Sequence, residues 1–259
     1  MTRRPLRTFN SSWGLPLAGT VLLLGLLGCG KDDPVPADPP VCEEPKPAQV
    51  SGFWQCGPTL DFTPINSYQG AFASIQDRED AVVLIAGVCT GTLIEASAGP
   101  VVLTAGHCVR LGDRPLVVFN FEDSPDGEEL LTEGTVIEQS STPDYALILL
   151  DALPAAITPV PLTTQATERL AIIQHPRGYR KVIAEGRYLD SCNQLVYYGD
   201  LDTLVGSSGA GVLNQQGFLV GVHTDGDCEE NGRGHNRGWT MESVVQASEY
   251  LQDSDIADR

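Results

Sequence analysis

The sequence predicts an all-β fold, with two antiparallel, six-stranded-type β-barrels in tandem and a C-terminal α-helix. Short apolar runs rich in Val, Ile and Leu recur along the chain, and Gly, Pro, Asp or Ser bounds each of them. Runs of this length and spacing are typical of strands in an antiparallel barrel or sandwich. A break near residues 152–160 divides the runs into two comparable sets. Each set is therefore expected to form one barrel.

The N-terminal barrel is expected within residues 67–155, and the C-terminal barrel with the final helix within residues 156–259. Strands of the first set are predicted at 81–88, 90–96, 100–106, 115–121 and 145–150. Strands of the second set are predicted at 170–174, 181–189, 195–199, 210–214 and 218–223. The one convincing helical pattern spans about Glu242 to Leu251.

Residues 1–28 have the layout of a secretory signal peptide. Three arginines precede an apolar run from Leu15 to Leu27, and small residues follow. The run is too short to span a bilayer as a mature helix. It ends in Leu-Leu-Gly-Cys, which resembles the bacterial lipobox, so that Cys29 is expected to carry lipid. The alternative is an ordinary cleaved signal with an incidental Cys.

The segment that follows, residues 29–66, is predicted to be a tether and N-terminal extension. Up to about Val50 it is dense in Pro and acidic residues, and few of its residues can build a core. A lipid on Cys29 would place the protein in a bacterial cell envelope. Gly30, rather than Asp, follows the Cys, which favours the outer membrane by resemblance to bacterial lipoprotein sorting.

The composition limits the partners and the cofactors. Without residues 1–28, which hold three arginines and no acid, the chain has 13 basic and 34 acidic residues, a net charge of −21. This charge argues against nucleic acid or an anionic membrane surface as a partner. Metal-site spacings such as CxxC and HExxH do not occur in the sequence. We expect no metal and no cofactor, and a monomer.

A histidine motif lies at the end of a predicted strand. Thr104-Ala105-Gly106-His107-Cys108 places His107 where the chain leaves the sheet, and Cys89 lies one hairpin earlier. "CTGTLI" followed by "TAGHC" resembles the chymotrypsin-like serine peptidases, and more closely their bacterial trypsin-like and glutamyl endopeptidase branch. The resemblance extends from about Tyr68 to the C-terminal helix.

The resemblance supplies two further catalytic residues, in the family's order His, Asp, Ser. Asp144 lies in a match to Asp-x-Ala-Leu, and Ser208 lies in a match to Gly-x-Ser-Gly. It implies that His107 is the base, that Asp144 orients it, and that Ser208 is the nucleophile. The amides of Gly206 and Ser208 would form the oxyanion hole, in a crevice between the barrels. Asp151, at the other end of the same strand, is the alternative to Asp144.

The implied function is a secreted, lipid-anchored serine endopeptidase that acts on polypeptides. The alternative is a protease-like binding or scaffold lipoprotein without activity. In animal digestive relatives an Asp precedes the nucleophile and pairs with a newly cut N-terminus. Ser207 stands at that position here, so this activation switch is not expected.

The residue preference of the enzyme rests on three candidate pocket residues. Thr203 and His223 fall where glutamyl endopeptidases carry a pocket Thr and His, which predicts cleavage after Glu or Asp. Asp202 falls where trypsin carries its pocket Asp, which would instead select Arg or Lys. The acidic preference is the favoured hypothesis.

Seven cysteines, one of them lipidated, leave six in an export context, which predicts three disulfides. The resemblance implies Cys89–Cys108. We further expect Cys192–Cys228, between the strand that leads toward Ser208 and the loop after His223. By exclusion, Cys42 would pair with Cys56.

Overall fold

The computed structural model describes residue 42 and residues 55–123, 128–154, 156–228 and 234–257. These residues belong to one compact unit, Pro39–Arg259. The predicted signal peptide, the lipidation site at Cys29 and most of the predicted tether lie outside the described residues. Within the described ranges, no helix has the length and apolarity that a membrane crossing requires.

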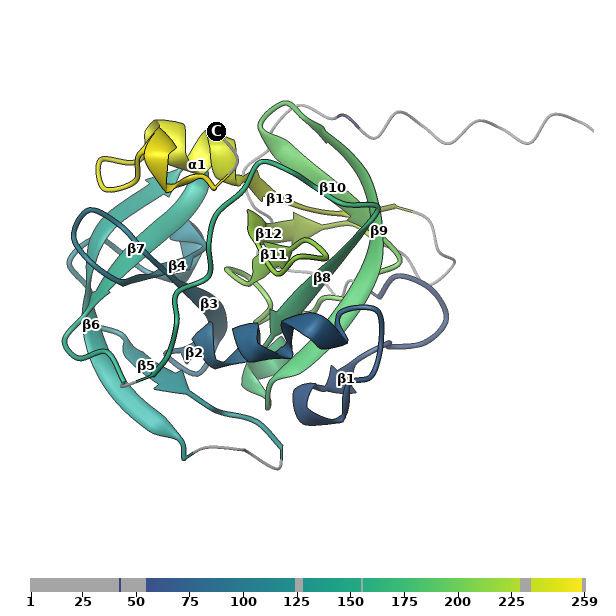
Figure 1. Cartoon of the computed structure of the whole chain (residues 1–259), viewed down its shortest axis with the longest axis horizontal. Helices are drawn as coiled ribbons and strands as arrows, with labels where there is room; N and C mark the ends of the chain where they lie inside the picture. Colours follow the sequence, from purple (N-terminus) through teal and green to yellow (C-terminus); the bar gives the residue numbers. More distant parts are fainter. Residues whose placement is uncertain (1–41, 43–54, 124–127, 155, 229–233, 258–259) are drawn as a thin grey trace, which may run out of the picture. The chain divides into compact units, whose positions relative to one another are not determined.

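Six antiparallel strands close the N-terminal barrel in the order β2-β3-β4-β7-β6-β5 (Figure 1). The strands are β2 (Val82–Ile85), β3 (Cys89–Ile94), β4 (Val101–Thr104), β5 (Leu116–Phe119), β6 (Leu130–Ser141) and β7 (Asp144–Leu150). Every residue of β2, β3 and β4 is buried. These strands therefore face the barrel interior on one side and neighbouring elements on the other.

The C-terminal barrel has the order β9-β10-β13-β12-β11-β8 and is closed by pairing between β8 and β9. The strands are β8 (Arg169–Gln174), β9 (Val182–Cys192), β10 (Leu195–Gly199), β11 (Gly211–Leu213), β12 (Leu219–Gly226) and β13 (Asn236–Thr240). A short strand, β1 (Thr63–Pro64), adds to the outer edge of β9. The predicted fold class, two antiparallel six-stranded barrels, is thus confirmed.

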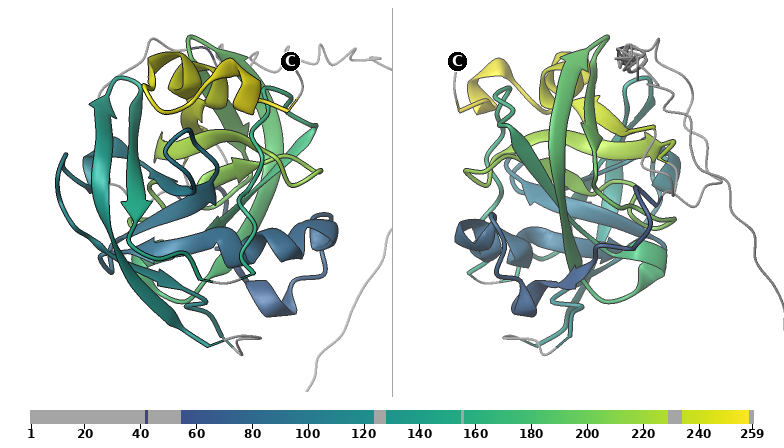
Figure 2. Two further views of the ribbon diagram at one scale, coloured as in Figure 1. Left: turned by 60° about the vertical axis from the view of Figure 1, so that its left-hand side comes forward. Right: turned by 90° about the vertical axis from the view of Figure 1, so that its right-hand side faces the viewer.

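The segment before β2 crosses from one barrel to the other (Figures 1 and 2). It runs from β1 on the C-terminal barrel through two 3-10 segments, η1 (Ile65–Ser67) and η2 (Ala73–Ala81), into β2. At the other end of the chain, the residues after β13 return to the N-terminal barrel, where the amide of Ser97 donates to Tyr250 O at 2.9 Å. Both ends of the fold therefore join the two barrels.

The final helix is shorter than predicted. Helix α1 spans Met241–Ala247, and the Thr240 side chain caps it by accepting a hydrogen bond from the amide of Ser243. After it, the hydroxyl of Ser248 accepts the amides of Tyr250 and Leu251 at 3.1 Å each. These bonds turn the chain out of the helix, which ends four residues before the predicted end.

Two of the three predicted disulfide pairings are wrong. Cys89–Cys108 is present as expected, but the other bonds are Cys42–Cys192 and Cys56–Cys228. The reason is that Cys42 and Cys56 each lie against the C-terminal barrel and not against one another. This arrangement brings Cys42 to the end of β9 and Cys56 to the residues that follow β12.

A buried ion cluster joins the crossing segment to both barrels. The ammonium group of Lys181, which is fully buried, contacts the carboxylate of Glu79 in η2 and lies 3.2 Å from Glu122 Oε2, after β5. Burial raises the pKa of Glu79 to about 8. Burial alone would also raise the pKa of Glu122, but the charge of Lys181 and hydrogen bonds with neighbouring side chains together hold that pKa below its usual value. One ammonium thus balances one carboxylate, and the second carboxyl group retains its proton near neutral pH.

Candidate active site

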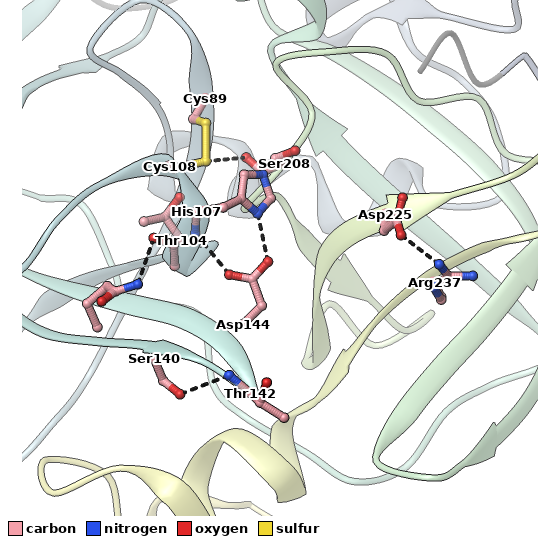
Figure 3. A network of polar contacts seen from close by, with 12 residues as sticks. Cys89, Thr104, His107, Cys108, Ser140, Thr142, Asp144, Ser208, Asp225 and Arg237 are labelled. Carbon is pink, nitrogen blue, oxygen red and sulfur yellow. Dashed lines mark hydrogen bonds and ion pairs between the residues drawn. A yellow bond between two sulfur atoms is a disulfide. The ribbon is translucent and has the colours of Figure 1, made fainter. Parts of the chain in front are cut away.

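His107 and Asp144 lie together because β4 pairs with β7. His107 is in η3 (Gly106–Cys108), which follows β4, and Asp144 is the first residue of β7. The ring nitrogen His107 Nδ1 lies 2.7 Å from Asp144 Oδ2, and the amide of His107 donates to Asp144 Oδ1 at 2.9 Å (Figure 3). Asp144 is buried. Its carboxylate therefore fixes both the backbone and the ring of His107, and leaves Nε2 as the atom available for a reaction.

Gly106 permits this close approach of η3 to the strands below it. A Cβ atom at this position would meet the backbone oxygen of Ser140 at 2.0 Å and Asp144 Oδ1 at 2.9 Å. Any other residue would push η3, and His107 with it, away from the carboxylate.

Ser208 reaches the same place from the C-terminal barrel, in the turn that precedes β11. The amide of Thr90 donates to Ser208 O at 3.0 Å, and Cys108 Sγ lies 3.7 Å from the same oxygen. The disulfide Cys89–Cys108 therefore lies beside Ser208, next to His107 (Figure 3). The hydroxyl of Ser208 makes no hydrogen bond within the described part of the chain, which is common for a nucleophile and its base without substrate.

The neighbouring Ser207 faces inward. It is fully buried, and its hydroxyl oxygen accepts a hydrogen bond from the amide of Leu204 at 3.0 Å. Ser208 is partly exposed. Of the two adjacent serines, Ser208 is thus the one that a substrate can reach.

Two backbone amides beside Ser208 have no acceptor. Gly206 N and Ser208 N make no hydrogen bond to any residue that the structure describes, whereas the intervening amide of Ser207 donates to Leu204 O at 2.9 Å. Gly206 has a φ of 100°, a conformation that favours glycine. Unpaired amides that flank a hydroxyl are suited to binding a negative oxygen.

Asp151, the alternative candidate for the acid, and the buried His175 lie elsewhere. Asp151 forms an ion pair with Arg114, and both side chains are about half exposed. His175 is fully buried, and its Nδ1 lies 3.0 Å from the backbone oxygen of Tyr179. Burial lowers the pKa of His175 to about 3. The structure brings neither residue to His107.

Asp202, the candidate for a trypsin-like pocket, is bound by the N-terminal segment. Its Oδ1 accepts the amide of Cys56 at 2.6 Å, and its Oδ2 accepts the amide of Asp61 at 2.5 Å. The side chain is buried, and burial raises the pKa of Asp202 despite these two hydrogen bonds. Both carboxylate oxygens are therefore engaged by the protein itself.

His223 lies on β12, directly against the turn that carries Ser208. Its carbonyl accepts the amide of Gly209 at 2.7 Å, and its amide donates to Ala210 O at 2.8 Å. The ring is buried, and its Nδ1 lies 2.5 Å from the hydroxyl of Tyr198. Burial lowers the pKa of His223 to about 3, so the ring is neutral, and burial raises the pKa of Tyr198 well above its usual value.

Thr203 is also fully buried, and its hydroxyl has no hydrogen-bond partner among the residues described. A buried hydroxyl without a partner is uncommon in native proteins.

Sequence analysis missed two features next to these residues. One is Tyr198, the partner of His223. The other is a buried ion pair, in which Arg237 Nη2 lies 2.6 Å from Asp225 Oδ2 (Figure 3). Asp225 and Arg237 are cross-strand partners on β12 and β13. The pair could have been found only from a prediction of β13, which the sequence pattern did not provide.

Comparison with known proteins gives one family and a common fold. The family profile described as "Trypsin-like peptidase domain" matches residues 89–222, just over half of the chain. A search of curated proteins finds no match.

Three solved structures illustrate the similarity. A serine endoprotease from Yersinia pestis is 15% identical with a TM-score of 0.55, over 69% of this chain and 65% of that one. The MamO protease domain from Magnetospirillum magneticum is 15% identical with a TM-score of 0.54, over 67% and 98%. A Glu endopeptidase is 20% identical with a TM-score of 0.54, over 73% and 96%. At such identities these structures share the fold.

Proposed function

Since the chain belongs to the family of trypsin-like peptidase domains, and is thus a serine protease, we propose that it is an endopeptidase with the triad His107, Asp144 and Ser208. The observation that carries this proposal is the distance of 2.7 Å between the buried Asp144 carboxylate and His107 Nδ1. The backbone of Ser208 lies beside Cys108, the residue after this histidine. The carboxylate fixes the tautomer with the proton on Nδ1 and leaves Nε2 as the base.

In the proposed reaction, Ser208 Oγ attacks the carbonyl carbon of the peptide bond, and His107 Nε2 accepts the hydroxyl proton. The carbonyl oxygen becomes an oxyanion, which the amides of Gly206 and Ser208 bind. His107 then gives its proton to the leaving nitrogen as the C–N bond breaks, and an acyl-enzyme remains on Ser208. A water molecule attacks the ester by the same route and restores the hydroxyl. Asp144 stabilises the imidazolium in both halves.

Cleavage after Glu or Asp is the residue preference that we propose. Two observations support it. The hydroxyl of Thr203 is buried without a partner in the described residues. If the Tyr198 hydroxyl, which keeps its proton, donates to His223 Nδ1, the proton of the neutral ring is on Nε2 and can be donated to a carboxylate. Asp202 has both its oxygens engaged, so it offers little attraction to Arg or Lys.

Secretion and a lipid anchor at Cys29 complete the proposal. Their support is the leader pattern of residues 1–28 and the three disulfides, because such bonds persist in oxidising compartments. In a bacterial host, Cys29→Ser is expected to move the protein from the membrane fraction to the soluble fraction. Retention in the membrane would contradict the anchor.

A fluorophosphonate probe tests the proposed chemistry, because it reacts only with an activated serine. We expect the wild-type protein and Ser207→Ala to be labelled, and Ser208→Ala to remain unlabelled. An unlabelled wild-type protein would favour the inactive binding module. Labelling of Ser208→Ala would move the nucleophile to another residue.

A mixed peptide library tests the residue preference separately. We expect cuts after Glu or Asp, and their selective loss in His223→Ala. Dominant Arg or Lys before the cut would contradict the acidic preference and leave the triad untouched.

A further inference from the structure

The turn from Val205 to Ser208, which we call the oxyanion turn, has each of its four carbonyl groups bound by a donor. A trans peptide bond holds its C=O and the following N–H antiparallel. A donor that fixes a carbonyl therefore also fixes the direction of the next amide. The contacts of Val205 O and Ser207 O therefore set the directions of Gly206 N and Ser208 N, and the contacts of Gly206 O and Ser208 O hold the peptides that follow these two amides. The inference below rests on the proposed function of those two amides.

The direction of each of the two free amides is set by the hydrogen bond that the carbonyl oxygen of the same peptide group accepts. The amide of Arg177, which has a φ of 56° in the turn before β9, donates to Val205 O at 2.5 Å and so aims Gly206 N away from that turn. The amide of Ala210 donates to Ser207 O at 3.0 Å and sets Ser208 N in the same manner.

The other two carbonyls are held by a single residue of the N-terminal barrel. The hydroxyl of Thr90 donates to Gly206 O at 2.8 Å, and the amide of Thr90 donates to Ser208 O at 3.0 Å. The same hydroxyl accepts the amide of His175 at 3.0 Å, so it links the turn containing Arg177 to the oxyanion turn. Thr90 is fully buried on β3.

We propose that Thr90 is the positioning residue of the oxyanion hole. Its hydroxyl and its amide hold two carbonyls of the oxyanion turn across the junction of the barrels, and the chain between them then presents Gly206 N and Ser208 N to one oxygen. Without the hydroxyl, the Gly206 carbonyl loses its donor and the amide of His175 loses its acceptor. The Gly206–Ser207 peptide is then held only through its amide, which donates to Leu204 O. The two groups that lose their partners are buried, and reorientation of the turn is the way for them to find new partners.

Neutral hydrogen bonds hold the oxyanion turn at Ser207, the position at which the animal digestive relatives have an Asp. Ser207, which precedes the nucleophile, makes neutral hydrogen bonds with Leu204 in both directions, through its hydroxyl and its amide. The described contacts thus hold the turn open with no ion pair at that position.

The test compares Thr90→Val with Thr92→Val. Thr92 is a matched control, because it lies two residues further along β3 and is equally buried. Its hydroxyl accepts a hydrogen bond from the amide of Gly211 at 3.1 Å, and Gly211 lies outside the oxyanion turn. Both variants lose one buried hydroxyl and are expected to lose similar thermal stability. For Thr90→Val we expect kcat to fall by about 10- to 100-fold with KM within about threefold, whereas Thr92→Val keeps kcat. Thr90→Ser is expected to restore kcat.

A second readout reports on the hole itself. A peptide aldehyde forms a hemiacetal with the nucleophile, whose oxygen occupies the oxyanion hole. Its affinity is expected to fall in Thr90→Val in parallel with kcat/KM. Equal kcat and equal aldehyde affinity in the two Val variants would overturn the role of Thr90.

Failure of the proposed function gives a different result. In that case the wild-type protein does not react with the fluorophosphonate probe. Crystal structures of the two Val variants then test the role of Thr90. Peptides at residues 205–207 that are rotated in Thr90→Val, and not in Thr92→Val, would support that role, and an unchanged turn in Thr90→Val would overturn it.

Discussion

The two barrels contribute to the candidate site in different ways. The N-terminal barrel brings His107 and Asp144 together through one strand pair, β4 with β7, and no distant segment is needed. The C-terminal barrel offers Ser208 on a turn whose geometry depends on Thr90 of the other barrel. Asp202, six residues before Ser208, depends in turn on the N-terminal segment.

The comparison teaches that the proposed base and its orienting acid are brought together by local geometry, whereas the proposed nucleophile and oxyanion donors are held by contacts from outside their own barrel. A carboxylate and a ring need only one short contact. Two amides that must point at one oxygen require every peptide of the turn to be fixed. Four predictions sharpen this comparison, in order of decreasing effect.

The largest effect is expected from removal of the nucleophile or the base. Ser208→Ala and His107→Ala, one from each barrel, should each lower kcat by about 10⁴- to 10⁶-fold with little change in stability. Residues of a triad act as a unit, so the double variant is expected to be no less active than either single variant. Peptide hydrolysis kinetics and thermal unfolding provide the measurements.

The matched pair for the acid is Asp144→Asn and Asp151→Asn. The first should lower kcat by about 10⁴-fold, because the ring then has the wrong tautomer. The second removes one partner of a surface ion pair and should leave kcat unchanged. Equal loss in both variants would mean that the local geometry of β4 and β7 does not select the acid.

A smaller effect separates the two disulfides of the N-terminal segment. Cys56 is itself bound to Asp202 through its amide, whereas Cys42 lies exposed at the end of β9. We compare Cys56→Ser/Cys228→Ser with Cys42→Ser/Cys192→Ser. The bonds join residues 172 and 150 positions apart, so each pair should cost a similar amount of stability, about 2–5 kcal/mol.

The cleavage preference is expected to differ between these two variants. Loss of Cys56–Cys228 loosens the backbone amides that hold Asp202, next to Thr203, so the peptide-library profile should broaden. Loss of Cys42–Cys192 should leave the profile as in the wild type. A profile that changes only in Cys42→Ser/Cys192→Ser would show that the hydrogen bonds of Cys56 and Asp61 to Asp202 do not maintain the cleavage preference.

The smallest effect concerns the pH dependence of the ion cluster at the barrel junction. The pKa of Glu79 is raised by burial from 4.5 to about 8, so the folded state binds a proton that the unfolded state releases. The resulting stabilisation is complete below about pH 4.5 and is lost as the pH rises through about 8. Glu79→Gln stays neutral at every pH and lacks this dependence.

Denaturant unfolding of both proteins measures this difference. We expect the free energy of unfolding of the wild type, relative to Glu79→Gln, to decrease as the pH rises from about 5 to about 8. A relative stability that stays constant, or that increases, over this range would show that Glu79 is ionised in the folded protein.

Much of the fold was predictable from local patterns. Each of the ten apolar runs contains a strand, because a run of Val, Ile and Leu between turn residues has few alternatives in water. The strands β6 and β13 were not predicted, although each completes a barrel. β6 carries Thr, Glu, Gln and Ser among its apolar residues, and β13 reads Asn-Arg-Gly-Trp-Thr. Their strand form comes from pairing with neighbours, which no local pattern contains.

The sequence by itself determined the motifs around His107, Asp144 and Ser208, and with them the family and the chemistry to be tested. Each motif is a short stretch whose residue types are dictated by local needs, such as Gly106 beneath the histidine turn. Only the tertiary structure decided the roles of Thr90 and Asp202 and the partners of Cys42 and Cys56. These depend on contacts between residues more than one hundred positions apart, and such contacts follow from how the segments pack in space.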